Sequence, residues 1–334
     1  MSRIGWQEIN EEDRERIKRD FPVSIINDLV RYDNGFVMPR KFAEKIEERI
    51  YNFELRDDDI WIVTYPKSGT TWTQELVWML VNDVDIEMGR VPLAKRSPFI
   101  EVDCLFTKDI LKSLGVPPAM LNGLPDDRIE YANTLEGRRV IKSHLPFEFL
   151  PPRLLERCKV VYVARNPKDT AVSFYHHNLN VPGHGFVGTF DGFMKYFEEG
   201  LHVFGSYWHH ILSGWQNRHH KNVKFVWFED MKRDTKNVID ELCEFLHHPL
   251  SEDLKGVLND HVQFENMKKN PYANPTAIMN TPPEKQFMRK GQVGDWKNYF
   301  DKERDTKWEH WIAENIEGTG LEEVEHLKHI RETN

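Results

Sequence analysis

Five consecutive residues, Lys67 to Thr71, combine the side chains that bind a phosphate group. Lys67 supplies a positive charge, and Gly69 allows the backbone to approach an anion closely. Hydroxyl donors come from Ser68, Thr70 and Thr71. This segment therefore predicts a phosphate-binding loop.

The residues on either side of this loop predict the elements that position it. Apolar and β-branched residues from Ile60 to Tyr65 indicate a strand buried on both faces, which Pro66 ends. From Trp72 onward apolar residues recur with a helical period, and the N-terminus of such a helix favours an anion. A kinase P-loop is excluded, because its motif places the lysine after a second glycine. From these residues alone, an ordinary turn with a surface lysine is the alternative.

The segment Tyr65 to Trp72 resembles the 5′-phosphosulfate loop of the cytosolic sulfotransferases, which use 3′-phosphoadenosine-5′-phosphosulfate (PAPS). The resemblance extends from about Gly35 to Lys297. Within the family, the chain resembles the insect branch that includes retinol dehydratase. It implies that PAPS is the co-substrate and PAP the product, that the loop binds the phosphosulfate, and that Trp72 stacks on the adenine.

A second segment, Val140 to Pro146, is a short apolar strand that ends in a cation and an imidazole, Lys142 and His144. In an open α/β sheet, ligands bind beyond the carboxyl ends of the strands. A single histidine in a loop is more often structural than catalytic. This segment resembles the K-[TS]-H-L-P motif of the sulfotransferases, which implies that both residues are catalytic.

A third strand, Cys158 to Ala164, leads into Arg165 and a well-signalled helix start with Asn166 as N-cap and Pro167 at the first position. Ser173 lies two turns into this helix. The segment resembles the family's 3′-phosphate site, in which Arg165 and Ser173 bind that phosphate. The planar guanidinium of arginine suits this role.

The segment from Phe287 to Lys297 is basic, contains glycines and has almost no apolar period. Without further comparison, these properties indicate a solvated loop. It resembles the family motif R-K-G-x-x-G-D-W-K, in which Arg289, Lys290 and the backbone of Gly291 close over the 3′-phosphate.

The resemblance also implies that Phe228 and Phe264 contact the adenine. Two departures weaken hydrogen bonding to this base, since the family usually has tyrosine at Phe228 and threonine or serine at Val262. The family's dimer motif is also altered, at Lys297 to Thr306, so we expect a monomer or a dimer through another surface.

By resemblance, His144 would remove the proton of an acceptor hydroxyl, and an unperturbed imidazole titrates near neutrality. Lys67 would contact the oxygen that bridges phosphorus and sulfur, Lys142 would contact the sulfonyl oxygens, and Ser173 would hold Lys67 until an acceptor arrives. The acceptor would be a small apolar phenol or alcohol. The alternatives are a retinol-dehydratase-like elimination and a non-catalytic PAP-binding protein. A kinase would need a Walker loop and a carboxylate for Mg²⁺, and the sequence shows neither.

Strands near residues 60, 140, 160 and 225 alternate with helical patterns, which predicts one α/β domain over 1–334 with a largely parallel sheet covered by helices on both faces. Residues 40–53 predict an amphipathic helix. We expect 1–39 to wrap the surface or rim a pocket. The interval 81–139, rich in proline and glycine, is a candidate acceptor lid, with a structural extension as the alternative.

The composition narrows the partners. A net charge of −9 argues against a general nucleic-acid or membrane binder, and a charged N-terminus with no long apolar run argues against secretion or anchoring. Three scattered cysteines fit a reducing compartment, so we expect a cytoplasmic protein. Four histidine pairs lack a carboxylate at a ligand spacing, and we expect no metal.

Overall fold

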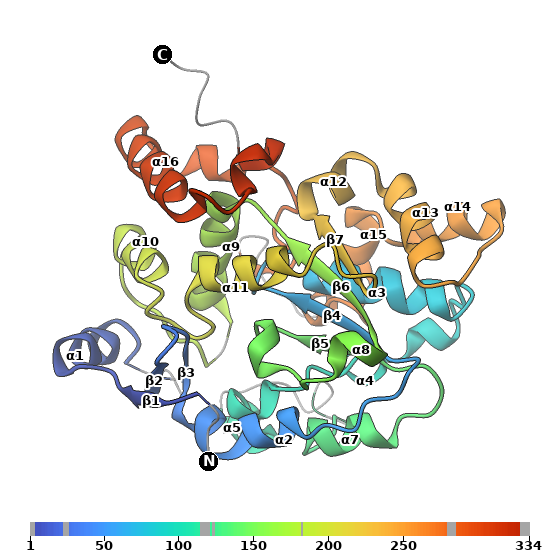
Figure 1. Ribbon diagram of the computed structural model, residues 1–334, viewed down its shortest axis with the longest axis horizontal. Coiled ribbons are helices and arrows are strands. Elements are labelled where there is room, and N and C mark those ends of the chain that lie inside the picture. The colour runs from blue at the N-terminus through green and yellow to red at the C-terminus, as the bar shows by residue number, and fades with distance from the viewer. Residues whose placement is uncertain are drawn as a thin grey trace.

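A four-stranded parallel sheet forms the centre of the computed structural model (Figure 1), which describes residues 4–22, 27–113, 121, 124–181, 183–278 and 285–327. The strand order is β5 (Val140–Ser143), β4 (Ile60–Thr64), β6 (Lys159–Ala164) and β7 (Val223–Trp227). All five residues of β4 are buried, as its continuous apolar run predicts. The predicted α/β class with a parallel sheet is therefore confirmed.

Alternate residues of each strand enter two separate apolar cores. On one face, Ile60 and Ile62 pack with α3 (Thr70–Val81), α12 (Phe228–Arg233), α13 (Thr235–Phe245) and α14 (Glu252–His261). On the other face, Trp61 and Val63 pack with α9 (Pro167–Asn180), α10 (Phe190–Glu198), α11 (Tyr207–Gln216) and α16 (Lys302–Ile316). The expected cover of helices on both faces is thus present (Figure 1).

Shorter elements fill the connections. The other α-helices are α1 (Glu11–Asp20), α2 (Glu47–Tyr51), α4 (Leu93–Arg96), α5 (Lys108–Ser113), α7 (Arg128–Thr134), α8 (Leu154–Arg157) and α15 (Phe264–Lys269). The 3₁₀ turns are η2 (Met88–Arg90), η3 (Val102–Cys104), η4 (Phe147–Phe149), η5 (Pro275–Ile278), η7 (Asp295–Asn298), η8 (Leu321–Glu323) and η9 (Glu325–Leu327).

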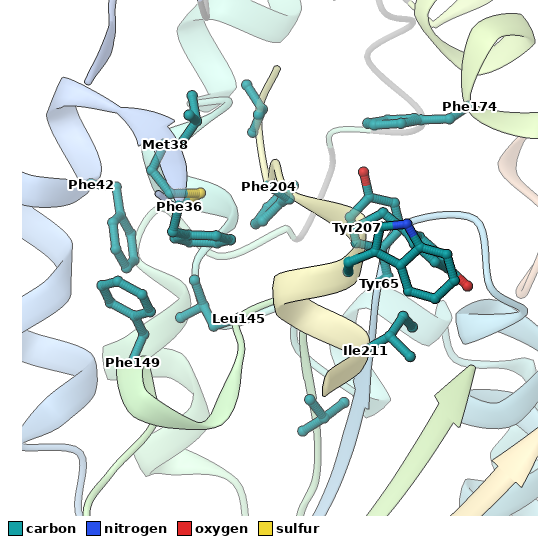
Figure 2. Packing of buried hydrophobic residues seen from close by; sticks show 14 of the residues in the cluster. Phe36, Met38, Phe42, Tyr65, Leu145, Phe149, Phe174, Phe204, Tyr207 and Ile211 are labelled. Carbon is teal, nitrogen blue, oxygen red and sulfur yellow. The ribbon is translucent and has the colours of Figure 1, made fainter. Parts of the chain in front are cut away.

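The N-terminal segment contains regular structure that the sequence pattern does not reveal. Three antiparallel strands, β1 (Trp6–Glu8), β2 (Leu29–Tyr32) and β3 (Val37–Pro39), form a second sheet. Phe36 is fully buried, and its ring centre lies 5.0 Å from that of Phe149 (Figure 2). This segment therefore contributes to the core as well as to the surface.

The helix expected over 40–53 is present in two parts. A π-helical turn, η1 (Phe42–Ile46), precedes α2. Phe42, Ile46 and Ile50 form the buried face that an amphipathic helix requires, but Glu47 is buried too and accepts a hydrogen bond from the Tyr32 hydroxyl at 2.8 Å. The π turn shifts the register of the helix, so a glutamate on the expected polar face turns inward.

The sheet brings three chain segments to one edge. Lys67 follows β4, His144 follows β5 and Arg165 follows β6, all at carboxyl ends of neighbouring parallel strands. Tyr65 anchors the first of these segments, since it is fully buried with its ring centre 5.1 Å from that of Tyr207 (Figure 2). A site at this edge is thus built on rigid elements.

Candidate active site

The loop after β4 has the backbone form that anion binding requires. Gly69 caps α3 with φ of 100°, and a Cβ at this position would lie 2.7 Å from the Phe228 ring. Lys67 also has a positive φ, 71°, and its carbonyl oxygen accepts a hydrogen bond from Arg165 at 3.1 Å. The Ser68 hydroxyl is buried without a partner among the described residues. These groups fit an anion that is bound by the loop.

Four cations surround the same space. Burial lowers the pKa of Lys67 to about 7, and three nearby positive charges contribute to this shift. They belong to Lys142, Arg165 and Arg289. A group of cations that disfavour one another's charge is stabilised when a polyanion binds between them.

The ring of His144 is oriented by β4. Its Nδ1 lies 2.7 Å from the carbonyl oxygen of Thr64, which can only accept, so Nδ1 carries the proton. The neutral ring then has its lone pair on Nε2, and His144 lines the cavity. Burial, followed by the charge of Lys142, holds the pKa of His144 well below its usual range. The pKa of His144 thus lies below that of an unperturbed imidazole, because a buried imidazole beside cations stays neutral.

Lys142 rests on an aromatic ring and beside a buried acid. Its Nζ lies 4.1 Å from the centre of the Phe99 ring, and burial lowers its pKa to about 8. Glu101 accepts a hydrogen bond from the backbone N–H of His144, and burial raises its pKa to about 7. Glu101 thus joins the interval 81–139 to the strand end that carries Lys142 and His144.

The predicted 3′-phosphate residues converge from α9 and the C-terminal loop. The Asn166 side chain caps α9 as expected, accepting from the N–H of Lys168 at 2.9 Å, and Ser173 lines the cavity. Asp169 accepts hydrogen bonds from the backbone N–H groups of Gly294 at 2.6 Å and Trp296 at 3.0 Å. This double contact holds the C-terminal loop against α9.

Arg289 and Lys290 reach this region but are both paired with Asp295, at 2.5 Å each. Burial would raise the pKa of Asp295, but hydrogen bonds from Lys290 and Arg289 outweigh it and lower the pKa to about 2. A phosphate bound here would share these two cations with a carboxylate that is ionised at neutral pH.

Three aromatic residues border the space predicted for the base. The rings of Trp72 and Phe228 meet edge to face at 5.6 Å. Lys232 Nζ lies 5.6 Å from the Trp72 ring centre and 5.9 Å from that of Phe264, so these rings flank one region. Gly291 packs on Phe264, where a Cβ would lie 2.2 Å from the ring.

One cavity of about 1060 Å³ contains these groups. Its remaining lining is mainly apolar, and much of it comes from the interval 81–139. The apolar residues from that interval are Pro92, Leu93, Ala94, Phe99, Val102, Leu105, Phe106, Leu111, Leu121 and Leu124. The interval thus lines the cavity, while 114–120 and 122–123 lie outside the described residues.

Several residues of the site were not predicted from the sequence. Three of them contact residues that are distant in the chain, namely Glu101, Asp169 and Lys232. His177 and Phe287 both contact Lys67, with its Nζ 3.5 Å from His177 Nδ1 and 4.3 Å from the Phe287 ring centre. The pairing of His176 with His177 was visible as a motif, but only the helix geometry shows which of the two faces Lys67.

Comparison with known proteins decides the family. The family model described as the sulfotransferase domain matches residues 57–320. The chain belongs to the sulfotransferase family. Luciferin sulfotransferase of Photinus pyralis is 35% identical over 94% of this sulfotransferase and 86% of its own length. Human sulfotransferase 1E1 is 36% identical over 86% of this chain and 93% of its own.

Solved structures agree with this assignment. Retinol dehydratase in complex with androsterone and PAP superposes with a TM-score of 0.86 at 29% identity, covering 96% of this sulfotransferase and 98% of that chain. Retinol dehydratase with retinol and PAP gives the same values. The predicted likeness to the branch that includes retinol dehydratase is thus confirmed.

Two further properties of the sulfotransferase concern its described residues alone. No group of three or more His, Cys, Asp or Glu side chains is arranged there to hold a metal ion. Within the same residues, every helix is either too short or too polar to cross a membrane. Cys104, Cys158 and Cys243 are buried free thiols.

Proposed function

We propose that this sulfotransferase moves the sulfonyl group of PAPS to the hydroxyl of a small apolar phenol or alcohol. The observation that carries the proposal is a neutral His144, protonated on Nδ1, in a cavity shared with Lys67 and Lys142. An imidazole that can accept a proton and two lysine side chains in one cavity support the proposal, because sulfonyl transfer to a hydroxyl needs a base and positive charge.

The cofactor would lie across the carboxyl ends of β4 and β6. Its 5′-phosphosulfate would be bound by the loop residues Lys67, Ser68, Gly69, Thr70 and Thr71. Its 3′-phosphate would contact Arg165, Ser173, Arg289, Lys290 and the Gly291 backbone. Its adenine would lie among Trp72, Phe228 and Phe264. Support comes from three buried polar atoms that have no hydrogen-bond partner among the described residues, Ser68 Oγ, Arg165 Nε and Trp72 Nε1.

In the proposed reaction the acceptor oxygen forms a bond to sulfur while the bond from sulfur to the phosphate oxygen breaks. The acceptor proton passes to Nε2 of His144. Lys67 offsets the charge that develops on the departing phosphate oxygen, and Lys142 offsets that on the sulfonyl oxygens. The products are a sulfate ester and PAP. The lysines and the loop N–H groups supply the positive field, so we assign no metal to the reaction.

The acceptor would occupy the apolar part of the cavity, with the interval 81–139 as its lid. Support comes from the apolar lining and from the relatives, whose names and complexes include luciferin, androsterone and retinol. The likeness to retinol dehydratase favours a second candidate, in which an allylic sulfate ester goes on to eliminate sulfate.

The three buried thiols support a reducing compartment, and we propose the cytoplasm. We also propose a monomer or a dimer through a surface other than the family's. The altered motif forms the start of α16, where Asp301 caps the helix by accepting from the N–H of Arg304. Light scattering of the purified protein tests the oligomeric state.

The decisive experiment incubates the protein with PAPS and a panel of hydroxylated phenols, steroids and polyene alcohols, and identifies products by mass spectrometry. We expect an acceptor-dependent gain of the sulfonyl group and one PAP per product. The matched control replaces PAPS by adenosine 5′-phosphosulfate, which lacks the 3′-phosphate. Stoichiometric loss of water from a polyene alcohol would select the elimination. Failure to convert any acceptor, with no PAP binding, would overturn the proposal.

A further inference from the structure

The side chain of Lys67 is held by two groups that the proposed function does not use. Its Nζ lies 3.5 Å from Nδ1 of His177 and 4.3 Å from the centre of the Phe287 ring. His177 is on α9, one helical turn after Ser173, and Phe287 belongs to the segment before Arg289. Among the described residues, His177 rather than Ser173 is therefore the hydrogen-bonding partner of the Lys67 amine.

The protonation states of Lys67 and His177 allow the lysine to donate a hydrogen bond to the histidine. Burial, followed by the charge of Lys67, holds the pKa of His177 well below its usual range, so its ring is neutral. Below about pH 7, where Lys67 is charged, its ammonium group can only donate, and the neutral imidazole can accept this hydrogen bond on Nδ1. The negative face of the Phe287 ring attracts the same charge.

The contact also sets where the amine lies within the cavity. The charges of Lys142 and Lys67 and the ring of His144 all act on His177, so these groups lie in one part of the cavity. Lysine has a long flexible side chain, and a fixed partner removes most of its rotamer freedom before the reaction. Lys67 is thus held near Lys142 and His144, two of the predicted catalytic residues.

We propose that His177 is a positioning residue for Lys67 in sulfonyl transfer, accepting a hydrogen bond from its amine and keeping it next to His144 and Lys142. The inference rests on the proposed function for the role of Lys67. It assigns a role to a histidine that neither the motifs nor the resemblance indicate.

A double-mutant cycle tests the inference. We expect His177→Phe to lower kcat about tenfold, the low end for a charged hydrogen bond, while KM for PAPS changes less than about threefold. His177→Gln keeps an acceptor and should recover most of this loss. In a Lys67→Ala background, His177→Phe should cost nothing further. The matched control is His176→Phe, because Nε2 of His176 bonds the Tyr299 hydroxyl at 2.9 Å, so its cost should be the same in both backgrounds.

A second measurement does not depend on turnover or on an acceptor. Lysine resonances are titrated by NMR in isotope-labelled protein, with Lys67→Arg identifying the signal of Lys67. His177→Phe should lower the pKa of Lys67, whereas His176→Phe should not. The other titratable or charged groups that face this pair are Lys142, Arg165, Arg289, His144 and His184.

The outcomes separate the inference from the proposed function. An equal loss for His177→Phe with and without Lys67, or an unchanged pKa of Lys67 in that variant, would overturn the positioning role. Absence of any sulfonyl transfer by the unaltered protein would overturn the proposed function instead, and the NMR titration would still decide the contact.

Discussion

The carbonyl oxygen of Thr64, at the end of β4, lies 2.7 Å from Nδ1 of His144, which follows β5. This hydrogen bond between neighbouring strands fixes the tautomer of the predicted base. The Thr64 hydroxyl, 2.6 Å from that of Thr70, ties the same strand end to the first residue of α3. The predicted base and the predicted phosphate loop are therefore both held by one residue, Thr64, through its carbonyl oxygen and its hydroxyl.

Replacing His144 by asparagine should lower turnover by about 10²- to 10⁴-fold, because positioned base catalysis contributes that much. PAP affinity should stay close to that of the unaltered protein. The measurement combines steady-state kinetics with calorimetry of PAP binding, and the exposed His219→Asn is the matched control. A variant that loses PAP binding to the same degree as turnover would make His144 a cofactor-site residue.

The pH dependence of kcat should show no rise that belongs to His144 between about pH 6 and pH 8. The pKa of His144 is held well below 6.5, so the ring is already neutral and competent as a base throughout this range. A rate profile with saturating PAPS checks this. An ascending limb near pH 6.5 that vanishes in the His144 variant would contradict the buried, neutral imidazole.

Binding of PAP near pH 8 should be accompanied by proton uptake. The pKa of Lys67 is about 7 in the free protein, so its amine is largely neutral at that pH, and a phosphate beside it would raise the pKa. Calorimetry in buffers of different ionisation enthalpy measures the uptake. The proton uptake should decrease below about pH 6, where Lys67 is already charged before PAP binds.

The control for this uptake is Lys67→Met, which removes the titrating amine and keeps the length of the side chain. Lys142 has a pKa of about 8 and contributes a background that the control retains. Identical uptake by the two proteins would show that Lys67 does not approach the bound phosphate.

The 3′-phosphate should dominate cofactor recognition. A charged hydrogen bond is worth roughly 1.5 to 3 kcal/mol, or about 10- to 150-fold in affinity, so 3′,5′-ADP should bind at least that much more tightly than 5′-AMP. Arg165→Ala should reduce the difference in affinity between 3′,5′-ADP and 5′-AMP. Titration of both nucleotides provides the test, and equal dissociation constants would refute the assignment of Arg165, Ser173, Arg289 and Lys290.

Truncation of Phe106 to alanine should raise KM for the acceptor several-fold and leave PAP affinity unchanged, since Phe106 lines the apolar part of the cavity. The matched control is Ile86→Ala, in the same interval but exposed. Kinetics with one identified acceptor measure both effects. If PAP affinity falls and acceptor KM does not move, the interval 81–139 belongs to the cofactor side.

Local patterns were sufficient to predict the elements that carry the site. The apolar run before Pro66, and the N-cap and proline at the start of α9, each specify a strand or helix within a few residues. The antiparallel N-terminal sheet was missed because its strands are only three or four residues long, too short for a period.

Contacts between distant segments could not be predicted in the same way. The depressed pKa of His144 follows from burial beside Lys142, and the pairing of Arg289 with Asp295 follows from the fold of a loop without period. The contact of Lys67 with His177 joins residues 110 positions apart. Such relationships depend on how the helices pack on the sheet, which residue types alone do not specify.

The double hydrogen bond of Asp169 has a consequence for how the protein is made. Its two backbone donors, Gly294 and Trp296, lie 125 and 127 positions later in the chain. The ribosome therefore completes the sheet and the strand ends that precede Lys67, His144 and Arg165 long before the loop that Asp169 holds exists. A nascent chain that stops short of Gly294 can build these strand ends but cannot hold that loop against α9, so the contact forms only in nearly finished chains.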